Sequence, residues 1–158
     1  MHVFVYDPYV EKENIKISGA IPVDNIIENL PKMDAITLHC PKNNETTDLF
    51  TKQEFDLMKK SSFIINCARG GILNEEDLYE ALINKKIAGA GLDVFDVEPT
   101  PSSNPLFKLN NVILSPHIAG VTIESTIRMA IETVQNVLDV LDDKINQSVV
   151  VNNKEIGM

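Results

Sequence analysis

The sequence predicts an α/β fold with a doubly wound parallel sheet. Short apolar runs alternate along the chain with segments of helical periodicity, which is the pattern of strands joined by crossover helices. A residue able to take part in binding or catalysis follows directly after most of these runs. The length of 158 residues fits one domain, and a hydrophobic content of 44% supplies enough apolar surface for a core.

The expected strands are short apolar segments, at 2–6, 20–23, 35–39, 63–66, 87–92 and 112–114. The expected helices run over 24–30, 51–59, 74–86 and 122–142. A Thr51-x-x-Glu54 capping box marks the start of the second helix, and Pro31 marks the end of the first.

The last expected helix is predicted to bury one face, because its apolar residues recur at helical spacing. These residues are Ile123, Ile127, Ala130, Ile131, Val134, Val137, Leu138 and Leu141. We interpret the stripe as a face packed on the core and not as part of a cofactor site. Residues 144–158 are expected to form an extended tail, so the domain itself covers residues 1–143.

Charge and composition exclude several classes of protein. A net charge of −9 repels phosphate backbones and anionic membranes, so neither nucleic acid nor a membrane is an expected partner. No apolar run approaches the roughly 20 residues that cross a bilayer, and the N-terminus does not have the pattern of a signal peptide. Two cysteines, Cys40 and Cys67, lack a CxxC spacing, which argues against a zinc site and suits the cytoplasm.

The residues that follow the predicted strands define a candidate site. In a parallel sheet the carboxyl ends of the strands share one edge, and ligands bind in the crevice outside that edge. The residues expected there are Asp7, His39, Cys40, Arg69, Asp93 and His117. The sequence therefore predicts that they converge on one site.

Arg69 lies in the segment Ala-Arg-Gly-Gly directly after the strand at 63–66. The planar guanidinium matches a carboxylate bidentately, and the glycines let the backbone turn sharply beside a ligand. The alternative is a surface arginine in a tight turn. We favour carboxylate binding because the arginine follows an apolar strand.

Two carboxylates follow other strands. Asp7 can accept hydrogen bonds from the ribose hydroxyls of a dinucleotide and would repel a 2′-phosphate, which favours NAD over NADP. The alternative is that Asp7-Pro8 is only a turn. Asp93 ends the strand at 87–92, where it can contact a nicotinamide carboxamide.

His117 is a candidate general acid and base, because it follows the strand at 112–114 and histidine is the side-chain type suited to proton transfer near neutral pH. A single histidine is also often structural. Glu98, on the loop after Asp93, could orient this imidazole and favour its protonated form.

Four sequence blocks carry a resemblance to a known family: LHCP at 38–41, INCARGGILNEEDL at 65–78, GAGLDVFDVEP at 89–99 and SPHIAG at 115–120. Together they resemble the D-isomer-specific 2-hydroxyacid dehydrogenases, which include phosphoglycerate, glycerate and D-lactate dehydrogenases. The match extends from VYDP at 5–8 to SVVVN at 148–152. Arg69, Glu98 and His117 have the order and spacing of the family's catalytic trio.

The resemblance implies a Rossmann-type domain and an NAD-dependent oxidoreductase acting on the CH–OH group of a small D-2-hydroxy acid. It assigns substrate binding to Arg69, proton transfer to His117 and the positioning of His117 to Glu98. It implies cofactor contacts from Asp7, Cys40, Thr46, Cys67 (through its backbone), Asp93, His117, Ala119 and Gly120. Relatives in the family are usually dimers, so the resemblance allows a homodimer, and no metal is expected. The resemblance also makes the cysteines site-lining, with a reactive Cys67 as the alternative.

One departure from the family stands out. The glycine fingerprint GxGxxG, expected before the strand at 2–6, is absent, so the sequence resembles a domain that lacks its first strand–GxGxxG–helix unit. In the order 3-2-1-4-5-6 that strand is central, and its neighbours at 2–6 and 35–39 would lose their shared partner. The expected function is therefore a dehydrogenase present as an incomplete chain. The alternative is a catalytically inactive NAD-binding or interaction module.

Overall fold

The computed structural model describes residues 1–152 and divides the chain into two compact units. The first covers residues 1–117, and the second begins at Ile118. The domain boundary predicted between residues 143 and 144 stays a prediction. The predicted tail contains a short 3₁₀ turn, η3 (Gln147–Val149), and its last part, 153–158, lies outside the described residues.

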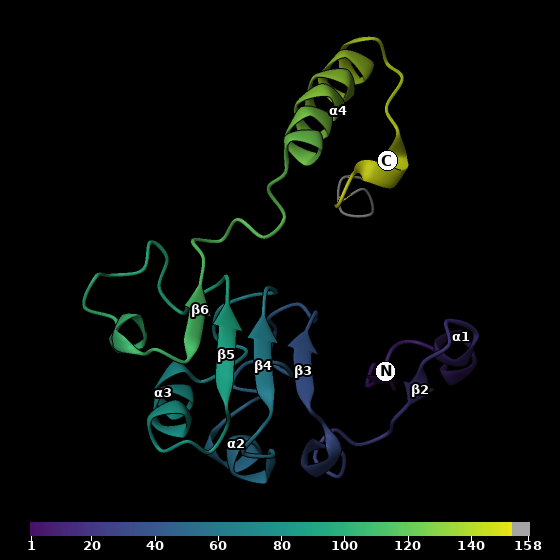
Figure 1. The fold of residues 1–158 in the computed structure, drawn as a ribbon. Helices are drawn as coiled ribbons and strands as arrows, with labels where there is room; N and C mark the ends of the chain where they lie inside the picture. Colours follow the sequence, from purple (N-terminus) through teal and green to yellow (C-terminus); the bar gives the residue numbers. More distant parts are fainter. Residues whose placement is uncertain (153–158) are drawn as a thin grey trace. The chain divides into compact units, whose positions relative to one another are not determined.

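A four-stranded parallel sheet forms the centre of the first unit (Figure 1). Its strands, in spatial order, are β3 (Ala35–Leu38), β4 (Phe63–Asn66), β5 (Gly89–Leu92) and β6 (Val112–Leu114). The predicted α/β parallel sheet is therefore confirmed, and the predicted bounds of β4 and β6 agree with the structure.

The two strands nearest the N-terminus form a separate parallel sheet. Strands β1 (Phe4–Val5) and β2 (Ile21–Pro22) pair with each other and are joined by α1 (Lys12–Ile17). Within residues 1–152, β1 and β3 share no neighbouring strand, as predicted. The prediction that all the strand-end residues share one edge is wrong for Asp7, because it follows a strand of this second sheet.

Helices α2 (Lys52–Leu57) and α3 (Glu75–Ile83) pack on one face of the larger sheet. The core between them is apolar, with buried side chains that include Phe50, Phe55, Ile64, Leu78 and Leu82. The opposite face of the sheet is open, since Phe63 and Ile113 are 49% and 80% exposed. Only one layer of helices therefore covers this sheet within the described part of the first unit.

Local capping explains where both helices begin. Thr51 and Glu54 form the predicted capping box at the start of α2. Asn74 caps α3, since its side chain accepts a hydrogen bond from the backbone N–H of Asp77 at 3.1 Å.

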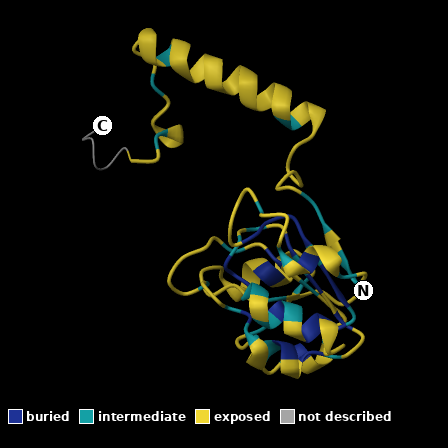
Figure 2. Cartoon of the chain, turned by 90° about the vertical axis from the view of Figure 1, so that its left-hand side faces the viewer, coloured by how far each residue is buried: buried dark blue, intermediate teal, exposed yellow. Residues whose placement is uncertain are grey.

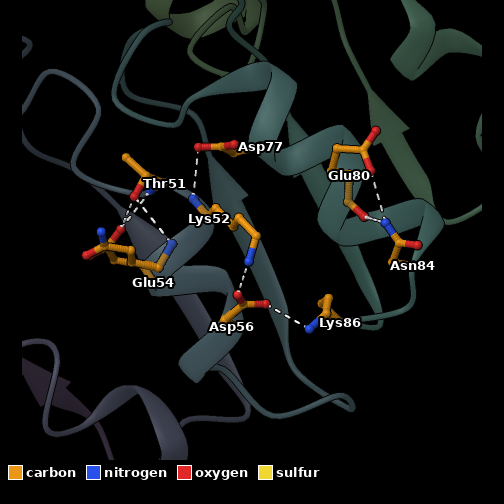
Figure 3. Close-up of polar contacts among 9 residues, drawn as sticks. Thr51, Lys52, Glu54, Asp56, Asp77, Glu80, Asn84 and Lys86 are labelled. Atoms are coloured by element: carbon orange, nitrogen blue, oxygen red, sulfur yellow. Dashed lines mark hydrogen bonds and ion pairs between the residues drawn. The ribbon is translucent and has the colours of Figure 1, made fainter.

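Polar contacts join α2 to α3 on their solvent side (Figure 3). The backbone N–H of Lys52 donates to Asp77 at 2.9 Å, and Lys86 forms an ion pair with Asp56 at 2.9 Å. These contacts add to the apolar packing between the helices and link the start of α2 to α3.

The helix predicted at 24–30 is wrong. The structure has turns there, followed by a single 3₁₀ turn, η1 (Leu30–Lys32). The side-chain oxygen of Asn25 accepts a hydrogen bond from the backbone N–H of Ile27 at 2.9 Å. The backbone carbonyl of Asn25 accepts a second one from the side chain of Asn29. Such side-chain bonds compete with a continuous helix.

Helix α4 (Ile123–Leu141) confirms the last predicted helix, whereas the packing of its apolar face on the core stays a prediction, because α4 belongs to the second unit. None of its residues is buried, and Figure 2 shows the helix exposed along its length. Among the described residues, the second unit contains only α4 and η3, so it has no second layer on which the apolar stripe could pack. No helix in the described chain is long and apolar enough to span a membrane.

Candidate active site at the carboxyl edge of the parallel sheet

Four parallel strands bring the predicted strand-end residues of the first unit to one edge. The paired ends Leu38, Asn66, Leu92 and Leu114 lie in register across β3, β4, β5 and β6. The residues that follow are His39, Cys40, Arg69, Asp93 and His117. This part of the predicted convergence is present in the fold.

The side chain of Asn66 holds the loop that carries Arg69 through two hydrogen bonds. This buried side chain donates to the carbonyl of Arg69 at 2.9 Å and accepts from the N–H of Ala68 at 3.0 Å. Gly70 lies against the loop that follows β5. A Cβ at this position would be 1.8 Å from the carbonyl oxygen of Phe95. The turn therefore requires glycine, and the exposed Arg69 side chain is presented from a fixed backbone.

His117 and Glu98 are in direct contact. The imidazole Nδ1 lies 2.8 Å from Glu98 Oε2, while Oε1 of the same carboxylate accepts the backbone N–H of Phe95 at 2.9 Å. The hydrogen bond from His117 and the one from Phe95 lower the pKa of Glu98. An ionised Glu98 accepts a hydrogen bond from Nδ1–H, which leaves Nε2 as the ring nitrogen available to a ligand.

The backbone at His117 is unusual. Its φ is +55°, in the left-handed region that most residues other than glycine avoid, although asparagine, aspartate and histidine adopt it more often than the rest. Such conformations collect at functional sites, where the surrounding structure holds them in place.

Asp93 is a second carboxylate at the same edge and is 2% exposed. The Ser115 hydroxyl donates to its Oδ1 at 2.6 Å, so the ends of β5 and β6 are joined by this bond. Reasoning from the sequence assigned no role to Ser115 or to Asn66. Both are polar residues directly at a strand end, and that position is the signal that could have identified them.

Two hollows lie along this edge of the first unit. One, of about 660 Å³, is lined by Phe95, Glu98, Pro99, Thr100, Phe107, Leu114, Ser115, Pro116 and His117. The other, of about 620 Å³, is lined by His39, Cys40, Pro41, Lys42, Ala68 and Arg69. The second has basic side chains and no carboxylate in its lining, which suits an anionic ligand.

The remaining predicted residues are more scattered. Asp7 is exposed, and its Oδ1 accepts the backbone N–H of Tyr9 at 2.9 Å, as in the turn that was the alternative reading of Asp7-Pro8. Thr46 donates to the carbonyl of Pro41 at 2.6 Å and so holds the loop after β3. Ala119 and Gly120 belong to the second unit.

Both cysteines are free. Burial raises the pKa of the Cys40 thiol, whereas Cys67 is exposed at the end of β4. Among residues 1–152, no three histidine, cysteine, aspartate or glutamate side chains gather into a metal-binding cluster.

Residues 1–119 match the model of the NAD-binding domain of the D-isomer specific 2-hydroxyacid dehydrogenases. The chain belongs to this family. It is 41% identical over 150 residues to D-3-phosphoglycerate dehydrogenase of Methanocaldococcus jannaschii, a match that covers 95% of the chain and 28% of that relative. It is also 42% identical over 127 residues to glyoxylate reductase of Thermofilum pendens, covering 80% of the chain and 37% of the relative.

Solved structures agree with this assignment. D-lactate dehydrogenase of Aquifex aeolicus, complexed with NAD and lactic acid, superposes with a TM-score of 0.80 at 32% identity, covering 91% of the chain and 47% of that protein. The TT0316 protein of Thermus thermophilus superposes with a TM-score of 0.84 at 32% identity, covering 93% of the chain and 45% of that protein. The chain thus spans less than half of each of these relatives.

Proposed function

We propose that the protein is an NAD-dependent oxidoreductase that interconverts a D-2-hydroxy acid and the corresponding 2-keto acid. The observation that carries the proposal is the 2.8 Å contact between His117 and Glu98 at the sheet edge that also carries Arg69. A proton donor and a carboxylate-binding cation at one edge are what the reduction of a 2-keto acid needs.

The chain's own side chains divide the chemistry between them. NADH, when bound, supplies the hydride. The Arg69 guanidinium binds the substrate carboxylate bidentately and orients the adjacent keto carbon. His117 Nε2 donates a proton to the keto oxygen as negative charge develops there, and in the reverse direction it accepts the proton from the hydroxyl. Glu98 positions His117 and stabilises the imidazolium, since its lowered pKa keeps it ionised at neutral pH.

The cofactor contacts are proposed on the chemistry of the lining residues. The hollow beside Cys40 and Ala68 also has His39 and Lys42 in its lining, and these suit the negative charge of a dinucleotide. The remaining proposed contacts come from Asp7, Thr46, Cys67 (through its backbone), Asp93, His117, Ala119 and Gly120. An exposed carboxylate at Asp7 can accept the ribose hydroxyls and disfavours a 2′-phosphate.

Titration of the purified chain with NADH, followed by nicotinamide fluorescence, tests the proposal. We expect saturable binding, weaker binding of NADPH, and a smaller difference between the two cofactors in Asp7→Asn. Arg69→Lys keeps the positive charge but loses the planar guanidinium that binds a carboxylate through two hydrogen bonds. This variant should therefore weaken the binding of pyruvate to the NADH complex without changing NADH affinity. The absence of saturable NADH binding to a folded chain would contradict the proposal.

Turnover separates this function from the alternative of an inactive binding module. A catalytic chain should oxidise NADH in the presence of glyoxylate or hydroxypyruvate, and the rate should fall by about 100-fold or more in His117→Gly. An inactive module would bind NADH in both variants and show no turnover in either.

We further propose a homodimer in the cytoplasm, with a small 2-hydroxy or 2-keto acid as substrate. The exposed apolar stripe of α4 supports self-association, because apolar faces of this size are normally covered. Sedimentation equilibrium tests it: a monomer at all concentrations would contradict the dimer.

A further inference from the structure

The hollow next to His117 has an apolar wall that the proposed chemistry does not use. Its apolar lining comes from Phe95, Pro99, Phe107, Leu114 and Pro116. At about 660 Å³ it is large enough for a substituent of several carbon atoms, since pockets for drug-sized ligands begin at roughly 300 Å³.

The aromatic part of this wall is already formed. The rings of Phe95 and Phe107 meet edge to face, with centroids 6.1 Å apart and an interplanar angle of 81°. Phe95 is 6% exposed, and its backbone N–H is held by Glu98. Phe107 lies on the 3₁₀ turn η2 (Pro105–Lys108), which is anchored by the buried Leu106.

Phe107 itself is 45% exposed, although its neighbour in the ring pair is buried. A ligand that covers this ring removes apolar surface from water on both partners. The wall therefore favours an apolar ligand group and does not need to rearrange to receive it.

The charges around the hollow disfavour an anionic group. Its lining contains two ionisable side chains, Glu98 and His117, and no lysine or arginine. The pKa of Glu98 is lowered, so a phosphate or sulfonate placed here would meet a carboxylate and two aromatic rings, and the one side chain of the lining that can carry a positive charge, His117, is already paired with Glu98. The basic side chains Lys42 and Arg69 line the other hollow.

We propose that this hollow receives the side chain of the 2-keto acid, and that the preferred substrate carries an aromatic or other bulky apolar group and not a phosphate. The proposal rests on the proposed function, because it places the substrate carbonyl at His117. Phe107 is then a determinant of specificity, since its exposed ring is a surface that the substrate side chain covers.

Equilibrium binding to the chain with NADH present tests the proposal. Pyruvate, phenylpyruvate and 3-phosphohydroxypyruvate are compared by ligand-observed nuclear magnetic resonance. We expect phenylpyruvate to bind at least about 10-fold more tightly than pyruvate, the range found when hydrophobic pockets discriminate between side chains. The phosphorylated acid should bind more weakly than phenylpyruvate.

Two variants locate the effect. Phe107→Ala should reduce the preference for phenylpyruvate over pyruvate to less than about threefold. Phe107→Lys should shift the preference towards 3-phosphohydroxypyruvate, because it places a cation beside the hollow. Phe63→Ala is the matched control, since this ring is 49% exposed on the open face of the sheet and does not line the hollow; it should keep the preference.

Each outcome decides one question. Equal affinity for pyruvate and phenylpyruvate, or tighter binding of the phosphorylated acid by the unaltered chain, would overturn the proposal about the side chain and leave the proposed function standing. A chain that binds NADH but none of the three 2-keto acids would overturn both the proposal about the side chain and the proposed function. A preference for phenylpyruvate that persists in Phe107→Ala would also overturn the assignment of this hollow.

Discussion

Replacing Gly70 with alanine is expected to force two loops of the site apart. A Cβ at this position would lie 1.8 Å from the carbonyl oxygen of Phe95 and 2.2 Å from its carbonyl carbon. Real Cβ contacts stay above 3.0 Å, so one backbone segment must move by more than 1 Å. Overpacking costs about 1–3 kcal/mol, and we expect a loss of about 3 kcal/mol, because rotation of a side chain cannot relieve a contact with backbone.

Urea unfolding followed by circular dichroism measures this loss. Gly91→Ala is the control, since a Cβ there would meet only side-chain carbons of Ile65, at 3.8 and 3.9 Å. We expect the control to lower the free energy of unfolding by less than about 1 kcal/mol. The same displacement should weaken pyruvate binding to the NADH complex of Gly70→Ala, because Arg69 is the adjacent residue. Indistinguishable unfolding curves for the two variants would refute the reasoning.

Three further predictions concern charge and capping. Removing the ring in His117→Gly should raise the pKa of Glu98, because the carboxylate loses its main hydrogen-bond donor; a carbon-detected pH titration that shows no upward shift would contradict this. Burial, with the nearby Glu75 carboxylate, raises the pKa of Asp96, so its charge destabilises the fold above that pKa. Asp96→Asn should therefore stabilise the chain slightly at pH 7, and this gain should disappear as the pH falls and the Asp96 carboxyl of the unaltered chain protonates. Thermal unfolding measures the gain, and equal gains at acid and neutral pH would count against the prediction. Asn74→Ala should cost about 1 kcal/mol in urea unfolding and Asn74→Ser less, since serine also caps a helix and adds no charge beside Asp48, and equal losses would exclude a capping role.

The strands of the larger sheet could be predicted from sequence because burial and local pattern agree there. Segments such as Phe63–Asn66 are continuous apolar runs, and the chain leaves each one at a polar or glycine-containing loop. The short helix α1 was missed because it has one buried residue, Ile15, and no side-chain cap at Glu11. Gly19, with φ of +83°, follows its end and was the available signal.

The pattern on α4 correctly predicted a helix but could not identify what it packs against. Periodicity reports that a face is apolar, and the surface that covers the face depends on tertiary structure. The same limit applied to Asp7, because its position relative to the other strand ends depends on strand pairing. The contact between His117 and Glu98 was expected from the sequence and is observed, whereas their catalytic roles remain predictions.

The site residues that sequence reasoning missed share one property. Asn66 and Ser115 act through their neighbours: the first holds the loop that carries Arg69, and the second holds Asp93. Such roles are defined by distances between segments far apart in the chain. A motif describes residues that are close in sequence, so it predicted candidate reactive groups and omitted the residues that position them.

The left-handed backbone at His117 affects how any set of substitutions at this position should be interpreted. A β-branched residue would add conformational strain to the loss of the imidazole, so its defect would mix two causes. Glycine removes the ring without that strain, and asparagine tolerates the conformation while presenting a neutral amide. Comparing these two with valine would separate the energetic cost of the backbone from the contribution of the proton donor.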